Sequence, residues 1–180
     1  VKPGVQTARG GAGGGAVGAA VKLRRKVRNV VAGGGPDVRR AAAEAATEAA
    51  KELRVTRLLV IAVTVLTSLD ADDLAAVGQT GPAAEQVVRL AKLTKECARD
   101  GVVCSPREAA SVREACGPDF KLVVPGIRPS LSLSNDQKRT AGPADAVSAG
   151  ADFLVIGRPI TRAPDPVAAA RAMAATLSAS

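Results

Sequence analysis

Two stretches near the end of the chain decide the fold: Val123 to Arg128 reads VVPGIR, and Leu154 to Ile160 reads LVIGRPI. Each is an apolar run that is followed by a glycine and an arginine. A parallel strand with this ending brings a cation and an unobstructed backbone to a phosphate group. Two such endings in succession predict that one phosphate is held from two neighbouring strands.

These stretches belong to an alternation of strands and helices that is regular from residue 58 onward. Leu58 to Leu66 (LLVIAVTVL) is continuous and β-branched, which is typical of a strand covered on both faces. Further strands are expected at residues 29–32, 101–104, 120–125 and 152–156. Five strands in such an alternation predict right-handed βαβ units and a parallel sheet.

The alternation by itself does not separate a β/α barrel from a doubly wound sheet. The Gly-Arg endings on the final two strands favour the barrel, in which phosphate sites commonly follow strands 7 and 8. A closed eight-stranded barrel typically needs about 250 residues, whereas this chain has 180. The fold class expected is therefore α/β, as a partial (β/α)8 barrel.

Helices are expected between the strands. Ser105 and Pro106 are expected as the N-cap and first residue of one of them, and Val87, Leu90, Ala91 and Leu93 form the apolar face of another. The expected ranges are 38–53, 69–77, 83–98, 105–115, 142–149 and 165–177.

Composition limits the chemistry that the chain can perform. It contains no histidine, which excludes Ser-His-Asp and Cys-His nucleophiles and the usual histidine metal sites. Cys97, Cys104 and Cys116 lack C-x-x-C spacing, so buried thiols are expected in place of a disulfide framework or a zinc site. Any proton chemistry must then use lysine and carboxylates. No metal is expected, and no catalytic residue can be named from the sequence.

The net charge of +8 is confined to the front of the chain. Residues 1–57 carry 12 Lys and Arg against 4 Asp and Glu, whereas the remainder carries 13 of each. Residues 1–28 are predicted to be a low-complexity basic segment that is disordered or not authentic, and residues 29–180 a partial barrel domain with a phosphate site. No apolar run approaches the roughly 18 residues of a membrane span, so a soluble, cytoplasmic protein without membrane partners is expected.

In its strand ends and the helices between them, the chain resembles the family of orotidine 5′-monophosphate decarboxylase in its bacterial form. The matching pieces look like strands 4 to 8 of that barrel in their order and spacing. They are NVVAGGGPDVRRAAAEAA (29–46), LLVIAVTVLTSLDADDL (58–74), DGVVCSPREA (100–109), FKLVVPGIRP (120–129), DQKR (136–139) and AGADFLVIGRPIT (149–161).

The resemblance implies a lyase of pyrimidine biosynthesis that converts orotidine 5′-monophosphate to uridine 5′-monophosphate and CO₂ without a cofactor. It implies that Arg128, Gln137, Gly157 and Arg158 bind the phosphate end of the nucleotide substrate, which agrees with the reading of the strand ends. It also implies that Thr67 meets the pyrimidine ring. Members of the family form homodimers, which makes a homodimer the expected assembly.

The chain departs from the family at the array that performs the chemistry. The family stabilises and protonates the carbanion-like C6 with an Asp-x-Lys-x-x-Asp array, and no such array occurs here. Asp119-Phe120-Lys121 and Asp136-Gln137-Lys138 begin the pattern without its second Asp. Three explanations stay open: a gene fragment or mis-framed product, an inactive relative that keeps phosphate binding, or an array of a different form.

Two other classes of function rest on the front segment. Gly13, Gly15 and Gly18 satisfy the G-x-G-x-x-G pattern of dinucleotide binding, but no apolar strand precedes them and the run is rich in glycine throughout. The basic stretch Lys22 to Arg28 would attract nucleic-acid phosphates without specificity. Residues 1–57 hold no aromatic residue for base stacking, so a nucleic-acid partner is not expected.

Overall fold

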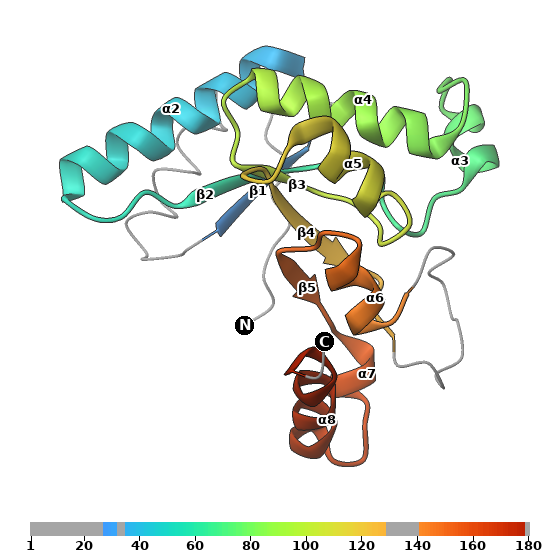
Figure 1. The fold of residues 1–180 in the computed structure, drawn as a ribbon. Helices are drawn as coiled ribbons and strands as arrows, with labels where there is room; N and C mark the ends of the chain where they lie inside the picture. Colours follow the sequence, from blue (N-terminus) through green and yellow to red (C-terminus); the bar gives the residue numbers. More distant parts are fainter. Residues whose placement is uncertain (1–26, 32–34, 129–140, 179–180) are drawn as a thin grey trace. The chain divides into compact units, whose positions relative to one another are not determined.

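The computed structural model describes residues 27–31, 35–128 and 141–178 (Figure 1). Its contacts divide the chain into two compact units. The first unit comprises Val1–Thr64 and Leu90–Val102, and the second comprises Val65–Arg89 and Val103–Ser180. Each unit is described separately below.

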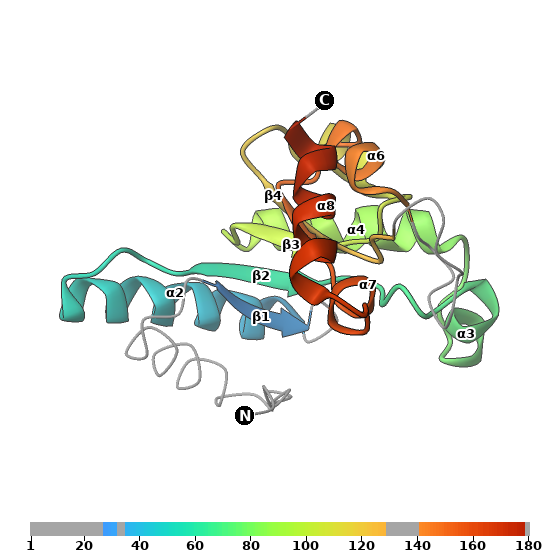
Figure 2. The same cartoon turned by 90° about the horizontal axis from the view of Figure 1, so that it is seen from below.

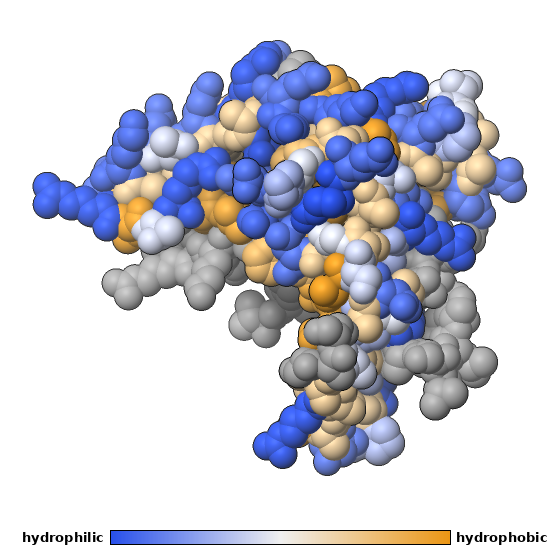
Figure 3. Space-filling model, in the orientation of Figure 1, coloured by the Kyte–Doolittle hydropathy of each residue, from blue (hydrophilic) through white to orange (hydrophobic). Residues whose placement is uncertain are grey.

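The first unit is built on two parallel strands and a helix. β1 (Val27–Val31) pairs with β2 (Leu59–Val63), residue 27 opposite residue 59, and α2 (Gly35–Leu53) joins them and packs against β2. Figure 2 shows α2 running beside these strands, and Figure 3 shows hydrophilic side chains along its outer side. The packed side of α2 is alanine, with Ala42 and Ala46 fully buried, and such small side chains let a helix lie close to a sheet.

An aspartate fixes the next strand of this unit. α4 (Ala83–Glu96) leads to β3 (Gly101–Val103), and Asp100 lies just before that strand. Its N–H donates to the Val60 carbonyl at 3.3 Å, and its carboxylate accepts from the Val60 N–H at 2.6 Å. The Arg57 guanidinium donates to both carboxylate oxygens at 2.7 and 2.8 Å. Asp100 thus sets the start of β3 against β2.

The second unit contains the last two strands and most of the helices. Its main elements are β4 (Lys121–Pro125) and β5 (Phe153–Val155), which are parallel, with Val123 opposite Phe153. The helices are α3 (Ala71–Ala76), α5 (Ala109–Cys116), α6 (Pro143–Ser148), α7 (Arg158–Thr161) and α8 (Pro166–Ser178). α5 packs against β4, whose Leu122 and Val124 are fully buried, while α6 and α7 pack against α8.

A second aspartate repeats the arrangement of the first. The Asp152 N–H donates to the Leu122 carbonyl at 3.0 Å, and its carboxylate accepts from the Leu122 N–H at 2.8 Å. Arg113 donates to the same carboxylate at 2.6 Å and Lys121 at 3.1 Å. The Arg113 guanidinium also donates to four backbone carbonyls: those of Gly117 and Pro118 after α5, of Phe120 before β4 and of Gly150 before β5.

The strand order confirms the predicted fold class. The hydrogen-bonded order is β1-β2-β3-β4-β5, the same as the order in the chain, and β1 with β2 and β4 with β5 pair in parallel. A doubly wound sheet reverses its strand order part-way, whereas a barrel adds each strand beside the one before it. The chain is therefore a partial β/α barrel.

Four details of the predicted elements need correction. β2 ends at Val63 and not at Leu66, which is 57% exposed. α5 begins at Ala109, because the Ser105 hydroxyl donates to the Glu108 carboxylate and residues 105–108 form a turn. Leu93, which was expected on the buried face of α4, is 39% exposed, and the neighbouring Thr94 is fully buried on that face instead. The short α7 was not expected.

The three cysteines are as expected. Cys97, Cys104 and Cys116 are all buried, with no disulfide between them. They contribute small apolar side chains to a core that is made mostly of Val, Ile, Leu and Ala, together with Phe120 and Met173.

Candidate phosphate-binding site

The parallel pairing of β4 and β5 brings two arginines to one edge of the second unit. Arg128 lies three residues beyond the last residue of β4, and Arg158 lies three residues beyond the last residue of β5. Pro125 and Val155, the two final strand residues, are register partners. Because parallel strands end at the same edge of a sheet, both arginines follow the carboxyl edge of this pair.

Arg128 is held by the backbone that follows β4. Gly126 has a φ of +81°, a conformation that glycine adopts without strain, and it turns the chain at the strand end. The Arg128 N–H then donates to the Ala141 carbonyl at 2.9 Å, and the side chain donates to the Ile127 carbonyl at 3.0 Å. With only 9% of its surface exposed, Arg128 is a buried cation at a strand end.

The segment that carries Gln137 begins and ends at this edge. Ile127 and Ala141 form a parallel bridge, and the Ala141 N–H donates to the Gly126 carbonyl at 3.4 Å. The chain therefore leaves the end of β4 and returns to it. Gln137 itself, together with Asp136 and Lys138, lies outside the described residues, so its role stays a prediction.

Gly157 and Arg158 form the junction between β5 and α7. The Gly157 carbonyl accepts from the Ile160 N–H at 2.9 Å and the Thr161 N–H at 3.0 Å, so Gly157 is the N-cap of α7. A Cβ added at Gly157 would meet no described atom within 4 Å. Packing among the described residues therefore does not require glycine at position 157. A ligand bound against the backbone there would require it, because a side chain would stand between the two.

Thr67 lies in the turn that precedes α3. It is buried, with 8% of its surface exposed, and the Leu69 N–H closes the turn on the Leu66 carbonyl at 3.0 Å. Its position after β2 agrees with a place at the carboxyl edge of the sheet. The pairing of β4 and β5 places Arg128, Gly157 and Arg158 after two neighbouring strand ends, while their binding of a phosphate and contact of Thr67 with a pyrimidine ring stay predictions.

Two buried polar residues after β3 were missed by the sequence analysis. Ser105 is fully buried and Glu108 is 4% exposed, and the Ser105 hydroxyl donates to the Glu108 carboxylate. Both residues lie shortly after the last residue of β3, just as Arg128 lies shortly after the last residue of β4. The signal was the polar Ser-Pro-x-Glu directly after an apolar strand, which was interpreted as a helix start.

Lys121, one of the lysines considered for the missing array, lies at the opposite end of β4 from Arg128. It is the first residue of that strand, and its ammonium binds the Asp152 carboxylate at 3.1 Å. The pair Asp119 and Lys121 therefore does not belong to the carboxyl edge, where the arginines lie.

Searches for a metal site and for a membrane span covered the same described residues. Among these residues, no three His, Cys, Asp or Glu side chains come together in a way that could hold a metal ion. None of their helices combines the length and the apolar character that crossing a membrane requires.

Comparison with known proteins links this geometry to one family. The sequence profile of the orotidine 5′-phosphate decarboxylase / HUMPS family matches residues 19–173. Orotidine 5′-phosphate decarboxylase of Trichlorobacter lovleyi is 54% identical over 145 residues, 81% of this chain and 59% of that relative. The enzyme of that name from Thermobifida fusca is 56% identical over 148 residues, 82% of this chain and 60% of the relative.

A solved structure extends the similarity to the fold. The crystal structure of orotidine 5′-phosphate decarboxylase from Lactobacillus acidophilus superposes with a TM-score of 0.81 at 34% identity. The superposition covers 96% of this chain and 72% of that one. The chain thus spans about three fifths of the length of the curated relatives it matches.

Proposed function

Since this chain belongs to the orotidine 5′-phosphate decarboxylase / HUMPS family, we propose that the whole protein converts orotidine 5′-monophosphate to uridine 5′-monophosphate and CO₂ in pyrimidine biosynthesis. Within that protein, the part described here supplies the site that holds the nucleotide by its phosphate. The activity is proposed for the whole protein because the chain covers about three fifths of the relatives that bear this name.

The observation that carries the proposal is the pair of arginines at one sheet edge. Arg128 and Arg158 follow two hydrogen-bonded parallel strands whose last residues are register partners. A guanidinium is a planar, permanently charged fork that matches the geometry of phosphate oxygens. Two of them at adjacent strand ends suit a dianionic phosphate monoester better than a neutral ligand.

Each proposed residue has a physical role in holding the substrate. Arg128 and Arg158 neutralise the phosphate, and Gly157 allows the backbone to approach it without a Cβ between them. Gln137 would donate from the segment that closes on Ala141, and Thr67 would meet the pyrimidine. Such binding remote from the reacting carbon orients the ring and supplies binding energy for the chemical step.

The chemical step itself needs groups that the 180 residues do not display in the family's pattern. Loss of CO₂ leaves an electron pair at C6, which a cation must stabilise and a proton must then quench. The Asp-x-Lys-x-x-Asp array that the resemblance implies for this task is absent from the sequence. The second candidate function for the chain is a catalytically inactive binder of nucleotide phosphate, which would need only the arginines that follow β4 and β5.

Phosphate binding is tested by titrating the chain with uridine 5′-monophosphate in a calorimeter. Arg158→Ala should weaken binding roughly tenfold to a hundredfold, because a hydrogen bond to a charged group is worth about 1.5–3 kcal/mol. The matched control is Arg162→Ala, which removes an exposed arginine from the other end of the same helix. Equal affinity in both variants would remove Arg158 from the site.

Decarboxylation is tested by the ultraviolet absorbance of orotidine 5′-monophosphate, which changes as the carboxylate leaves. A falling substrate signal supports the decarboxylase and means that lysine and carboxylates assemble in another pattern. A flat trace with uridine 5′-monophosphate binding intact supports the inactive phosphate binder.

We propose the remaining partners on the family resemblance alone. A homodimer in the cytoplasm is the expected state of the whole protein, and light scattering of the purified protein measures its mass directly. Nucleic acid is not an expected partner. The glycine-rich and basic segments on which the dinucleotide and nucleic-acid alternatives rest lie almost wholly outside the described residues.

A further inference from the structure

Ser105 and Glu108 form a buried polar pair in the turn between β3 and α5. Ser105 is fully buried and Glu108 nearly so, and the Ser105 hydroxyl donates to the Glu108 carboxylate. The Glu108 N–H also donates to the Ser105 carbonyl at 3.3 Å, which closes the turn. Burial of a hydroxyl and a carboxylate is costly even when the two groups bind each other. Such a pair therefore calls for a reason beyond the folding of one turn.

The pair does not cap α5, although its sequence has the pattern of a cap. A Ser-x-x-Glu stretch before a helix usually forms a capping box, in which both side chains bind backbone N–H groups. Here Glu108 is itself the N-cap residue, and its side chain makes no capping hydrogen bond. The Ser105 hydroxyl binds the Glu108 carboxylate instead. Departures from local sequence rules are expected at functional sites, where geometry takes precedence over stability.

The turn that the pair closes is joined to β4 on both of its sides. Cys104, the residue before Ser105, donates its N–H to the Val123 carbonyl of β4 at 3.2 Å. On the other side, the Glu108 carbonyl accepts from the Val112 N–H at 2.9 Å in α5, and α5 packs against β4. The hydrogen bond between Ser105 and Glu108 therefore sets how these two contacts with β4 are spaced.

The end of β4 depends on such support from its neighbours. Its last residue, Pro125, has no N–H to donate to another strand, and Gly126 follows with a φ of +81°. Arg128 comes two residues later and is buried, so packing leaves its side chain little freedom to compensate for a shift of the strand end. A misplacement of about 1 Å at a binding group can cost about a hundredfold in rate.

We propose that Ser105 and Glu108 are positioning residues of the phosphate site. They hold the end of β4 so that Arg128 meets the phosphate group of the nucleotide. Neither side chain touches the ligand in this role, which agrees with the complete burial of Ser105. The inference rests on the proposed function, because it assigns a role at the same phosphate site.

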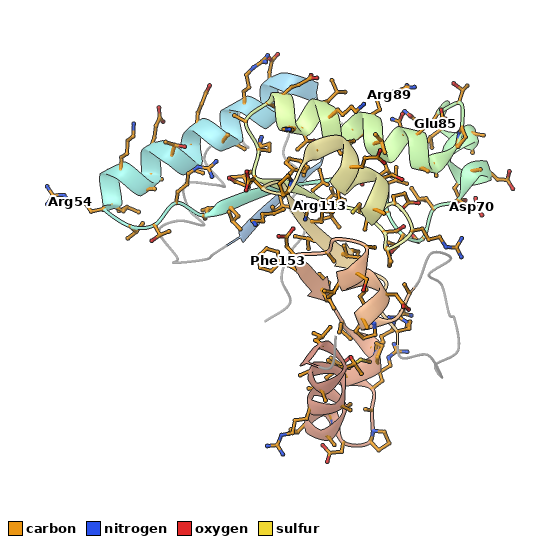
Figure 4. All side chains as sticks on the ribbon, viewed as in Figure 1. Arg54, Asp70, Glu85, Arg89, Arg113 and Phe153 are labelled. Carbon is orange, nitrogen blue, oxygen red and sulfur yellow. The ribbon has the colours of Figure 1, made fainter. Side chains whose placement is uncertain are left out.

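A carboxylate at the opposite edge of the same strands provides the comparison. Asp152 precedes β5, and Arg113 of α5 donates to its carboxylate at 2.6 Å. Figure 4 shows Arg113 between α5 and the start of β5, where Phe153 lies. This contact also ties a helix to a strand, but at the amino edge and not at the edge that Arg128 follows. A pair with a purely structural role should behave as Asp152 does.

The experiment is a double-mutant cycle on the 180-residue chain, with uridine 5′-monophosphate as the titrant in a calorimeter. Ser105→Ala should weaken nucleotide binding about tenfold. In an Arg128→Lys background the same substitution should have little further effect, because a flexible lysine depends less on its placement than a planar guanidinium. Asp152→Asn should leave the affinity within about twofold in either background, although it lowers the free energy of unfolding.

A second variant covers the case in which Ser105→Ala fails to fold with the Glu108 carboxylate left buried. Ser105→Ala/Glu108→Met removes both polar groups together and keeps the length of the larger side chain, a replacement that can be nearly neutral for stability. This variant should fold and still bind the nucleotide about tenfold more weakly, because the directional hydrogen bond is lost. Glu108→Gln retains an acceptor for the Ser105 hydroxyl and should keep the affinity within about threefold. Urea unfolding measures the stability of each variant separately.

Four outcomes would overturn the inference. They are unchanged affinity when the pair is removed, a loss of the same size in both backgrounds, an equal loss in Asp152→Asn, and failure of the double variant to fold. Failure of the unaltered chain to bind uridine 5′-monophosphate would overturn the proposed phosphate site as well. Binding that Arg158→Ala weakens and Ser105→Ala does not would overturn only the positioning role.

Discussion

Asp152 shows how a single carboxylate ties strands and helices together. Burial raises its pKa, but hydrogen bonds from the Leu122 N–H, the Lys121 ammonium and the Arg113 guanidinium outweigh this effect. The pKa of Asp152 therefore lies below its ordinary value. With the folded pKa below the unfolded one, the carboxylate contributes stability above about pH 4 and loses it as the pH falls through the folded pKa.

Replacing this carboxylate should change both stability and its dependence on pH. Asp152→Asn should lower the free energy of unfolding by about 1–2 kcal/mol at pH 7, because charge-assisted hydrogen bonds become neutral ones. The variant should also lose less stability than the unaltered chain between pH 5 and pH 3. Urea unfolding at several pH values measures both effects.

The control for that experiment is Asp119→Asn, which alters an exposed aspartate two residues before Lys121. It should leave the free energy of unfolding within about 0.5 kcal/mol of the unaltered value. If Asp119→Asn and Asp152→Asn gave the same pH profile, the Asp152 ion pairs would not account for acid sensitivity.

At the residue scale, the sequence revealed those groups whose local setting is distinctive. Arg128 and Arg158 were predicted together because each follows an apolar run and a glycine. The ion pair of Arg113 could not be predicted. Its carboxylate partner, Asp152, lies 39 residues further along the chain, and no local sequence pattern links the two residues. Ser105 was predicted as a helix cap, but its hydroxyl donates to Glu108, a contact that the same four residues allow equally well.

At the scale of elements, α3 has the most complete start. The Asp70 carboxylate accepts from the Asp73 N–H at 3.0 Å, and the Asp73 carboxylate accepts from the Asp70 N–H at 3.1 Å. This reciprocal pair satisfies backbone donors that a helix leaves open in its first turn. A helix of six residues has few other sources of stability.

Removing the cap should therefore destabilise α3. Asp70→Ala should cost about 1 kcal/mol of unfolding free energy, the usual value of an N-cap side chain, and should increase amide exchange at Leu74. Asp72→Ala provides the comparison, because that exposed residue lies in the same turn outside the capping pair. Equal effects of the two substitutions would show that the charge of the turn, and not the cap, stabilises this helix.

Most helices and strands could be predicted because their apolar residues recur with a clear helical or strand spacing. β1, β2, β3, β4 and β5 all fall within the expected apolar runs or begin next to them, and their lengths differ at the ends. α7 could not be predicted, because four residues that include Pro159 give no helical period. Thr94 on the buried side of α4 also carried no signal, since its hydroxyl is satisfied by the Leu90 carbonyl at 2.6 Å within the helix.

At the scale of the whole molecule, strand order was the property that the sequence left open. Alternating strands and helices suit a barrel and a doubly wound sheet alike, and only the pairing of strands far apart in the chain decides between them. The Gly-Arg endings indicated the barrel through its phosphate site, and the sequential order of the five strands confirmed it.

The sequential order predicts a gradient of backbone protection in the second unit. β4 lies between two strands, whereas β5 ends the sheet, so the Val124 amide should exchange with solvent at least roughly tenfold more slowly than the Val155 amide. Hydrogen exchange followed by mass spectrometry or nuclear magnetic resonance measures the ratio. Equal protection of the two strands in the isolated chain would show that β5 is covered.

Asp100 and Asp152 anchor two alternate strands, β3 and β5, by the same set of contacts. In each case the aspartate N–H donates to a carbonyl of the preceding strand, its carboxylate accepts from an N–H of that strand, and an arginine donates to the carboxylate. Each of these two strands is therefore anchored by an aspartate at its own start and by an arginine that precedes the neighbouring strand. The part of the chain that holds both members of such an ion pair is a stretch of two consecutive strands with the helix or helices between them, and a stretch of this kind can be duplicated as a whole. Barrels of this type could thus lengthen by copying one successful module.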